Sequence, residues 1–295
     1  MNAYYREYAD LLAEIFGAGK VQKIAIDVKA SCPNRDGTKG YGGCTYCNNK
    51  AFSPDYDKRL LSVADQIEQG KRFFARKYKD MRYVAYFQSY TSTHGRDVDD
   101  VIKLYEEAAS QPDVTGVIIA TRPDCMPDIL LQRIAEMARH TPVAIEYGAE
   151  SSHDDTLAAV NRCHTWAQTI DAVMRSYVAG IPVGLHLIMG LPGETRQMMM
   201  QTVRRVNELP VSSVKFHQLQ VLKGTAMASA PPPTFTLDEY LALCVDIVNI
   251  LRSDIAIERF ISQAPPDMLL APKWGLKNYQ FTHLLFKALQ SSRFE

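Results

Sequence analysis

Short, strongly apolar runs alternate with longer helical stretches between about residue 22 and residue 220, and this alternation limits the chain to few folds. Runs such as GVIIA and VGLHLIM are almost wholly apolar, which is typical of strands buried on both faces of a parallel sheet. The predicted strands are Val21–Val28, Tyr83–Gln88, Gly116–Ala120, Val143–Tyr147, Val183–Ile188 and Ser213–Leu219. Helices are predicted near 63–79, 98–110, 127–139, 165–179 and 195–208.

Parallel strands joined by right-handed crossover helices curl toward a barrel, and six such units fall short of the eight of a closed β/α barrel. We therefore expect an α/β fold, with a partial, open (β/α)6 barrel over residues 21–230 whose open side admits a large substrate. Residues 1–20 are expected to form a leading amphipathic helix. An α/β extension is expected over 231–295, after three consecutive prolines. It is predicted to contain helices near 236–252 and 277–290, a strand near Ile255–Ile261 and a loop through Pro265–Lys273.

Composition excludes several classes of protein. Apolar residues make up 46% of the chain and charged residues 22%, as in soluble globular proteins. No stretch approaches the roughly 18 uncharged apolar residues of a membrane span. The first twenty residues carry charges throughout, unlike a signal peptide. We expect a cytoplasmic protein with no membrane partner and with reduced cysteines.

The charges are unevenly distributed, although the formal net charge is zero. Residues 17–82 hold fourteen Lys or Arg and seven Asp or Glu, so the N-terminal third could meet phosphates. The alternative is that five of these cations are simply the solvated face of one helix. They are Lys71, Arg72, Arg76, Lys77 and Lys79.

Three cysteines lie shortly after the first predicted strand: Cys32, Cys44 and Cys47, separated by eleven and by two intervening residues. Loops at the carboxyl ends of strands form the active face of β/α folds, and glycines let the long loop fold back. A structural zinc ion is coordinated by four protein ligands, whereas three thiolates bound to a four-iron cluster leave one iron without a protein ligand. Zinc with Cys125 or a histidine as fourth ligand stays an alternative, as does a redox disulfide between Cys44 and Cys47.

The segment CPNRDGTKGYGGCTYC resembles the cysteine loop of the radical S-adenosylmethionine (SAM) enzymes. Its enlarged first gap departs from the common Cys-x3-Cys-x2-Cys and resembles the YhcC/YtqA-like subgroup. Wider relatives are the Elongator catalytic subunit and the oxygen-independent coproporphyrinogen oxidases. The resemblance extends from about residue 20 to the C-terminal end, including APKWGLKN at 271–278.

This resemblance implies two cofactors. Cys32, Cys44 and Cys47 would hold a [4Fe-4S] cluster, and SAM would chelate the open iron through its amino nitrogen and carboxylate. An electron from an external donor such as flavodoxin or ferredoxin would then cleave SAM to methionine and a 5′-deoxyadenosyl radical. The protein's tasks would be to aim that radical and to exclude water.

The resemblance also implies a set of SAM-binding residues. Tyr46 and Ile188 would lie near the adenine, and His186 near the ribose. Gln88 and Tyr90 occupy the place of the family's amino-group-binding segment, without its glycines and glutamate. Glu150 and Arg162 would contact the ribose hydroxyls and the SAM carboxylate. The alternatives are that Tyr46 is an ordinary half-buried tyrosine, that Glu150 and Arg162 pair with each other, and that His186 is a satisfied core histidine.

The sixth predicted strand has a polar end, which is unusual above a barrel unless something polar binds there. We expect a substrate to contact this end and the extension, although Trp274 could instead anchor the extension to the barrel. The candidates are His217, Gln218, Gln220, Lys223, Lys273, Trp274 and Lys277.

Members of the resembling family include enzymes that act on the tRNA wobble uridine. They remove a carboxymethyl group from 5-carboxymethylaminomethyluridine and leave 5-aminomethyluridine for a partner methyltransferase. The resemblance thus implies an anticodon arm as partner, with a splayed base stacked on Trp274 or a loop tyrosine. The alternatives are a radical SAM enzyme on a small molecule such as a tetrapyrrole, a non-catalytic zinc-binding module and a simple electron carrier, which would need a fourth thiolate.

Overall fold

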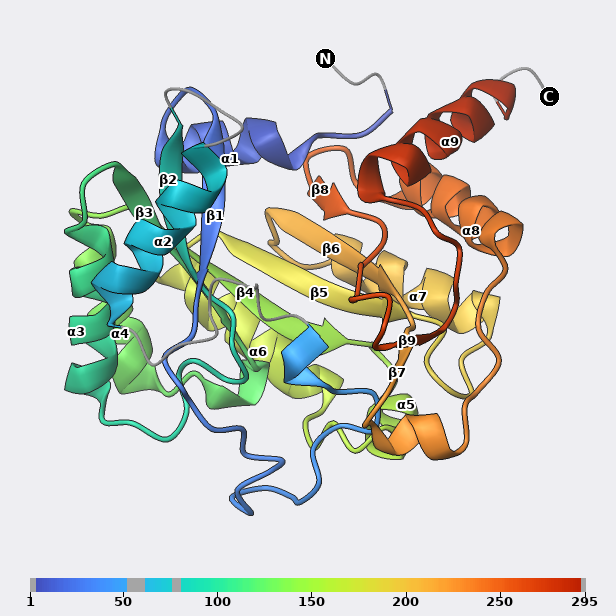
Figure 1. Ribbon diagram of the computed structural model, residues 1–295, viewed down its shortest axis with the longest axis horizontal. Helices are drawn as coiled ribbons and strands as arrows, with labels where there is room; N and C mark the ends of the chain where they lie inside the picture. The colour runs from blue at the N-terminus through green and yellow to red at the C-terminus, as the bar shows by residue number, and fades with distance from the viewer. Residues whose placement is uncertain (1–3, 52–61, 76–80, 293–295) are drawn as a thin grey trace.

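Seven parallel strands form one open, curved sheet in the order β1-β2-β3-β4-β5-β6-β8 (Figure 1). The computed structural model describes residues 4–51, 62–75 and 81–292. The strands are β1 (Val21–Ile26), β2 (Arg82–Phe87), β3 (Val114–Thr121), β4 (Val143–Glu150), β5 (Val183–Met189), β6 (Ser213–Gln218) and β8 (Ala256–Arg259). Because β1 and β8 end the sheet, it is a half-barrel with a lateral gap between them.

The predicted fold class is confirmed, and all six predicted strands are present. The seventh strand, β8, comes from the C-terminal segment and pairs in parallel with β6. The sequence predicted this strand near Ile255–Ile261 but assigned it to the extension, because a local pattern does not reveal which strand a distant run will join. The barrel sheet therefore has seven strands, not six.

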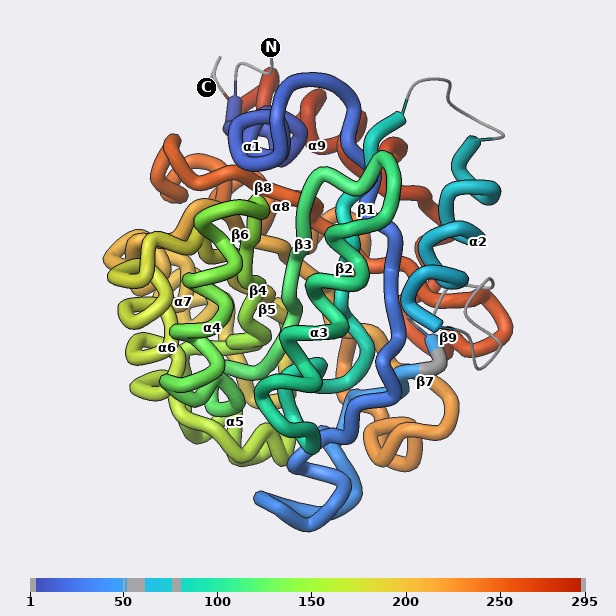
Figure 2. The backbone as a smooth tube through the Cα atoms, turned by 90° about the vertical axis from the view of Figure 1, so that its left-hand side faces the viewer, coloured from blue at the N-terminus to red at the C-terminus, as the bar shows by residue number. Residues whose placement is uncertain are grey.

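Helices cover the outer face of the sheet, as Figures 1 and 2 show. Their apolar faces pack on Ile24, Ile119 and Leu185 and their neighbours, which form the main hydrophobic core. These helices are α2 (Val63–Ala75), α3 (Val98–Ala109), α4 (Asp128–Ala138), α6 (Trp166–Val178) and α7 (Arg196–Asn207), followed by α8 (Leu237–Ile250) and α9 (Asn278–Ser291) in the C-terminal segment. The short α5 (Asp154–Ala159) and the 3-10 turns η1 (Asn49–Ala51), η3 (Pro123–Cys125) and η4 (Ala226–Ser229) were not predicted.

The predicted basic helix face lies partly outside the described residues, since Arg76, Lys77 and Lys79 are not among them. Within α2, Arg72 is exposed and lies 3.8 Å from Glu68, one turn away. Lys71 lies 3.6 Å from the carboxylate of Asp113. These two cations are thus partnered on the protein surface.

The N-terminal helix α1 (Tyr8–Phe16) closes the amino-terminal end of the half-barrel (Figure 2). Its Leu12 and Phe16 pack on inward-facing strand residues such as Val84 and Ile118. This approach requires Gly116, because a Cβ there would meet a Phe16 ring carbon at 2.7 Å and a backbone oxygen at 2.3 Å. The segment before α1 also joins β8, with the Ile257 amide donating to the Arg6 carbonyl at 2.9 Å.

A small antiparallel pair, β7 (Val221–Leu222) with β9 (Leu269–Ala271), lies after β6. The sequence had predicted a loop through Pro265–Lys273, where β9 forms three residues of strand. Within the part of the chain that the structure describes, no helix is long and apolar enough to span a bilayer.

Candidate active site

A cavity at the carboxyl ends of the strands brings together most of the predicted site residues. It holds about 1270 Å³ of space, counted to its open mouth. Residues of β2, β3, β4, β5, β6 and β8 line it, as expected for the active face of a β/α fold. The predicted residues on its wall are Cys32, Cys44, Tyr46, Cys47, Gln88, Tyr90, Glu150, Arg162, His186, Ile188, His217, Gln218 and Gln220.

The long loop between the first two cysteines folds back on itself through main-chain hydrogen bonds. The Pro33 carbonyl accepts from the amides of Lys39 and Gly40 at 2.9 and 3.0 Å, and the Asn34 carbonyl accepts from Gly43 at 2.8 Å. Gly43 has a φ of 79°, a conformation that favours glycine. This excursion, at the end of the molecule opposite α1 (Figure 1), lets Cys32 and Cys44 line one cavity despite the eleven residues between them.

Neighbouring turns hold the cysteine loop in place. Asn161 donates from Nδ2 to the carbonyls of Tyr41 and Gly43 at 3.1 and 2.9 Å. Asn34, fully buried, donates to the carbonyl of Asn161 and lies with Nδ2 3.5 Å from the Cys44 sulfur. The loop is therefore held by side chains that follow α5 as well as by its own backbone.

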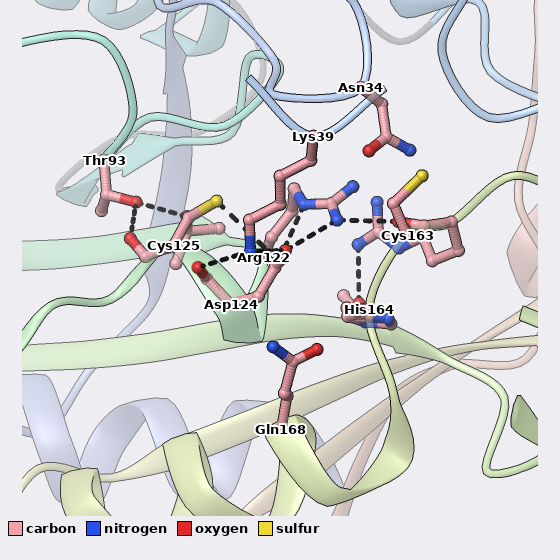
Figure 3. Close-up of polar contacts among 12 residues, drawn as sticks. Asn34, Lys39, Thr93, Arg122, Asp124, Cys125, Cys163, His164 and Gln168 are labelled. Atoms are coloured by element: carbon pink, nitrogen blue, oxygen red, sulfur yellow. Dashed lines mark hydrogen bonds and ion pairs between the residues drawn. The ribbon is translucent and has the colours of Figure 1, made fainter. Parts of the chain in front are cut away.

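A second attachment is an ion-pair chain, drawn in Figure 3. Lys39 of the loop reaches Asp124 at 2.5 Å, and Asp124 pairs with the buried Arg122 at 2.9 Å. Arg122 also donates to the carbonyl of Arg162 at 2.7 Å. Despite its burial, the pairs with Arg122 and Lys39 hold the pKa of Asp124 below its usual range. The chain links the loop to the residues after β3 and β4.

The three cavity cysteines are free thiols, as are the other three in the chain. Burial and the neighbouring Cys44 raise the pKa of the Cys47 thiol to about 11. Among the described residues, no group of three His, Cys, Asp or Glu side chains is arranged to hold a metal ion. Thiolates that bind separate irons of a cluster need not meet at one point, and a three-thiol donor set matches a four-iron cluster with one open iron.

Glu150 and Arg162 lie side by side on the cavity wall, with 3.2 Å between Oε1 and Nη2. The register of β4 against β5 shifts between Gly148 and Glu150, and Glu150 has a φ of 65°. A Cβ on Gly148 would lie 2.7 Å from Arg162 and 2.8 Å from Glu150, so glycine makes room for the pair. The two residues pair with each other, as the alternative interpretation held, and both remain on the cavity wall.

Among the described residues that line the cavity, Arg122 Nη1 and Arg259 Nε lack hydrogen-bond partners, and so do two buried atoms beside Cys44. These two are the Arg162 Nε and the Tyr46 hydroxyl. Burial, with the nearby Cys44, raises the pKa of Tyr46 well above its usual value, so the phenol remains a neutral donor. Buried donors normally find a hydrogen-bond partner. A polar cofactor with carboxylate or hydroxyl groups therefore fits this side of the cavity.

The floor of the cavity is a buried charged network centred on Glu146 of β4. Its carboxylate accepts from Tyr8 at 2.9 Å, Tyr86 at 2.8 Å and Lys23 at 2.6 Å, and its Oε2 lies 2.7 Å from His186 Nε2. Burial alone would raise the pKa of Glu146, but nearby lysines and His186 outweigh burial and hold that pKa well below normal. Glu146 is thus an anion held by donors from four elements.

His186 lies on this floor and remains neutral. Burial and the charge of Lys215 lower its pKa despite the contact with Glu146. As a neutral ring it donates from Nε2 to Glu146, which leaves the other ring nitrogen without a proton. His186 and Ile188 face the same cavity, as strand alternation predicted.

The polar end of β6 is largely occupied by contacts within the protein. Gln218 and Gln220 both donate to the carbonyl of Ser262, at 3.0 and 3.2 Å, and Gln218 also accepts from the Ser262 amide. These two side chains fix the segment after β8. His217 lies beside Arg259, whose Nη2 is 3.3 Å from each ring nitrogen.

Four predicted substrate residues do not line the cavity. Trp274 packs on Tyr240 and Phe281, with ring centroids 5.4 and 6.3 Å away, and its indole nitrogen donates to a main-chain carbonyl. It anchors the C-terminal segment, which was the alternative interpretation. Lys223, Lys273 and Lys277 are exposed, and Lys277 precedes α9 as its N-cap.

Sequence reasoning missed several residues of the cavity wall. Glu146, Lys215 and Tyr86 line it, together with Arg122 and Arg259. Glu146 is four residues, or two periods, before the predicted Glu150, and Lys215 is two residues before the predicted His217. Period-two alternation from the predicted inward residues could therefore have found both. For Arg259 no such signal existed, because a register shift sets its direction.

Comparison with protein families gives two matches. Residues 8–206 match the model of the radical SAM superfamily, and residues 211–291 match the radical SAM C-terminal domain. YtqA of Bacillus subtilis is 34% identical over 284 residues, which are 95% of this chain and 88% of that protein. YhcC of Escherichia coli is 36% identical over 260 residues, 86% of this chain and 82% of that protein.

More distant similarities extend to two archaeal proteins. The tRNA uridine(34) acetyltransferase of Methanocaldococcus jannaschii is 25% identical over 224 residues, 72% of this chain and 40% of that protein. The structure of Methanocaldococcus infernus Elp3, lacking its N-terminus, superposes with a TM-score of 0.71 at 14% identity. The superposition includes 94% of this chain and 64% of the Elp3 chain. At this low sequence identity, the similarity shows a common fold.

Proposed function

The chain belongs to the radical SAM superfamily, in the family of YtqA and YhcC, and we propose that it modifies the wobble uridine of a tRNA. The proposed reaction removes the carboxymethyl group of 5-carboxymethylaminomethyluridine as glyoxylate and leaves 5-aminomethyluridine, with SAM as the two-electron oxidant, which ends as methionine and 5′-deoxyadenosine, and with water as the second co-substrate. The observation that carries the radical chemistry is the meeting of three free cysteines with unpartnered buried donors on one cavity wall.

Superfamily membership implies a [4Fe-4S] cluster and SAM. Cys32, Cys44 and Cys47 would hold the cluster. When bound, the reduced cluster supplies the electron that cleaves SAM to a 5′-deoxyadenosyl radical, which abstracts hydrogen from the substrate. The chain itself contributes the position of the three thiols, which its folded-back loop and the Lys39–Asp124 attachment fix.

SAM would lie against the wall formed by Glu150, Arg162, Tyr46, His186 and Ile188. Glu150 would accept hydrogen bonds from hydroxyl groups, and Arg162 would offer its unpartnered Nε to a carboxylate. Tyr46 and Ile188 supply apolar surface from the small cluster that also holds Leu219. Gln88 and Tyr90, which follow the carboxyl end of β2, would complete the proposed SAM site.

The tRNA substrate is supported by the similarity to a tRNA uridine(34) acetyltransferase and by the open side of the half-barrel. A wobble base splayed from the anticodon loop needs a flat partner. Tyr90, on the cavity wall and 40% exposed, offers one, and Arg35 lies 5.7 Å above its ring. His217 and Gln220 would then face the base from β6 and the segment after it, and the exposed Lys223 would contact the RNA outside the cavity.

The proposal also includes partners. A flavodoxin or ferredoxin would supply the electron, and a methyltransferase would act on the aminomethyl product. The electron donor follows from the chemistry, since the cluster must be reduced before it can cleave SAM, and the methyltransferase is proposed because the exposed primary amine of the product is a nucleophile that such an enzyme can modify.

Mass spectrometry of tRNA nucleosides from a strain that lacks the gene tests this function. We expect 5-carboxymethylaminomethyluridine to accumulate and the aminomethyl product to disappear. The wild-type gene should restore the profile and Cys47→Ala should not, whereas Cys244→Ala, a change of a buried thiol in α8 away from the cavity, should restore it. Circular dichroism of both variants checks that each one folds.

An unchanged wobble-uridine profile in the deletion strain would eliminate the tRNA proposal. If the purified protein still forms 5′-deoxyadenosine, the small-molecule alternative takes its place. If Cys47→Ala retains SAM cleavage, the assignment of the three cysteines to the cluster is wrong.

A further inference from the structure

A second cavity opens at the lateral gap of the half-barrel, between the edge strands β1 and β8. It holds about 1220 Å³ of space, with Lys23 of β1 and Glu258 of β8 on its wall. Tyr86, Gln88, Lys215 and Arg259 line both this cavity and the active-site cavity. The two spaces therefore adjoin inside the barrel, and their shared wall is accessible from the active site.

The carboxylates and lysines of this interior neutralise one another. Glu258 lies 2.8 Å from Lys23 and 2.9 Å from Lys215. Glu146 lies 2.6 Å from Lys23 and 3.5 Å from Lys215. Two ammonium groups and two carboxylates thus form a closed set. Within the described residues, this set leaves no carboxylate for any further cation on the shared wall.

Arg259 is that further cation. Its guanidinium has no carboxylate within ion-pair distance in the described structure, and its Nε is buried without a hydrogen-bond partner. Arg259 is half-buried, and a charge that is partly removed from water without a counter-ion loses part of its hydration at a cost. Such a group in a cavity shared with the active site is expected to meet an anion there.

The backbone of β8 is built so that Arg259 faces the cavity. The register against β6 pairs Val214 with Ile257 but Lys215 with Arg259, so Glu258 is an extra residue in the strand. The register shift lets the consecutive residues Glu258 and Arg259 both line the interior, where a regular strand would turn one of them outward. Bulges of this kind often redirect a side chain next to an active site.

The neighbour of Arg259 does not compensate its charge. His217 has a pKa held well below its usual value by burial and by Arg259 itself, so its ring is neutral. A neutral imidazole offers one lone pair to the guanidinium and no negative charge. Four further donor positions of the guanidinium fork remain for a ligand, and two parallel N–H groups match the two oxygens of a carboxylate.

We infer that Arg259 binds a carboxylate of the substrate inside the half-barrel and thereby selects substrates that carry one. For the identity of that substrate the inference rests on the proposed function, whose carboxymethyl group supplies such a carboxylate. The alternative tetrapyrrole substrates carry carboxylates too. SAM has its own carboxylate, which the proposed site assigns to Arg162.

The test measures affinity with two anticodon stem-loop RNAs that differ only in the wobble nucleoside, 5-carboxymethylaminomethyluridine or 5-aminomethyluridine. The cluster-loaded protein is used, without reductant, so that binding is measured and not turnover. The wild type should bind the carboxymethylated RNA about tenfold or more tightly, as expected for a charge-assisted pair. Arg259→Gln should lose this preference and Arg259→Lys should keep part of it.

Arg204→Gln is the matched control, because it removes an exposed cation on α7 and leaves the cavity unchanged. It should retain the full preference. Iron content and SAM affinity of Arg259→Gln are measured in parallel. If its SAM affinity falls tenfold while the RNA preference persists, the carboxylate is that of SAM and the inference is overturned.

A second probe separates this inference from the proposed function. Coproporphyrin III and its tetramethyl ester differ only in free carboxylates. If the wild type binds neither RNA but prefers the free acid, and Arg259→Gln abolishes that preference, the carboxylate site stands and the tRNA function fails. If neither pair of probes shows a preference that depends on Arg259, the inference is wrong.

Discussion

Single residues fix the position of the cysteine loop, and Asn161 is the clearest case. Its φ of 55° is a left-handed conformation that asparagine tolerates better than most residues. Its side chain holds two carbonyls of the loop, those of Tyr41 and Gly43, and its own carbonyl accepts from Asn34. One residue outside the loop thus holds the loop at three points.

Replacing Asn161 by alanine should loosen the loop without unfolding the protein. Two hydrogen bonds of about 1 kcal/mol each are lost, and alanine adds about 1 kcal/mol of backbone strain. We expect iron to be lost to a chelator about tenfold faster, with an unchanged circular dichroism spectrum. Asn161→Gly removes the same hydrogen bonds without the strain and should fall between alanine and wild type. Iron retention equal to that of the parent would show that the loop does not depend on Asn161.

Spacing and alternation predicted much of the site at this scale. The cysteine gaps identified the loop, and period two along β5 put His186 and Ile188 on one wall. Two of the differences from the prediction have different physical causes. Arg259 reaches the cavity only because of an inserted residue in β8, and Trp274 packs inward because its aromatic partners come from distant helices. Neither cause leaves a local pattern.

Among the elements, α2 shows how closely a helix can approach the sheet. A Cβ at Gly70 would lie 2.4 Å from Cγ2 of Ile24 in β1, well inside van der Waals contact. Glycine is otherwise unfavourable inside a helix, by about 1 kcal/mol relative to alanine. Its presence here indicates that the packing distance between α2 and β1 outweighs helix propensity.

Gly70→Ala should therefore destabilise the protein by about 1–2 kcal/mol, since overpacking exceeds the gain in helix propensity. Urea unfolding measures this change. Ile24→Ala alone should cost about 2–5 kcal/mol, and in the double variant the new methyl group partly fills the cavity. The double variant should therefore lose less free energy of unfolding than the sum of the losses in the two single variants. Strict additivity would show that the two side chains do not meet.

Local sequence patterns predicted the positions of helices and strands better than which strands lie next to each other in the sheet. Five outer helices and six strands were predicted close to their observed positions, because each is long enough to show its period. The six-residue α5 is too short to show one. The place of β8 at the edge of the barrel sheet was also missed, because β8 joins the sheet through β6, with α8 between them in sequence.

Across the whole molecule, buried histidines couple stability to pH. Burial and the charge of Arg162 lower the pKa of His164 to about 3, and the pKa values of His186 and His217 are also lowered. In the unfolded chain these rings would bind protons below about pH 6.5, whereas in the folded protein they do not. Stability is therefore complete above pH 6.5 and falls as the pH drops toward the folded values. Glu146 and Glu258, whose pKa values are also lowered, add to this loss below about pH 4.5.

The free energy of unfolding should accordingly decrease between pH 7 and pH 5, by about 2 kcal/mol for His164 alone. Urea unfolding of the metal-free protein at several pH values measures the slope. His164→Gln should make the slope shallower by about one proton. His140→Gln, at an exposed position, should leave it unchanged. An equal slope in parent and His164→Gln would show that His164 is protonated in the folded protein.

The hydrogen bond between Arg6 and Ile257 joins the first described residues to a strand completed only near the end of the chain. During synthesis on a ribosome, the Arg6 carbonyl has no strand to pair with until residue 257 has emerged. Until then the strands on which Leu12 and Phe16 pack belong to an incomplete sheet. Premature termination before β8 would release a polypeptide with an unpaired β6 edge and a first helix that lacks its attachment to β8, which is the kind of surface that chaperones bind and proteases cut.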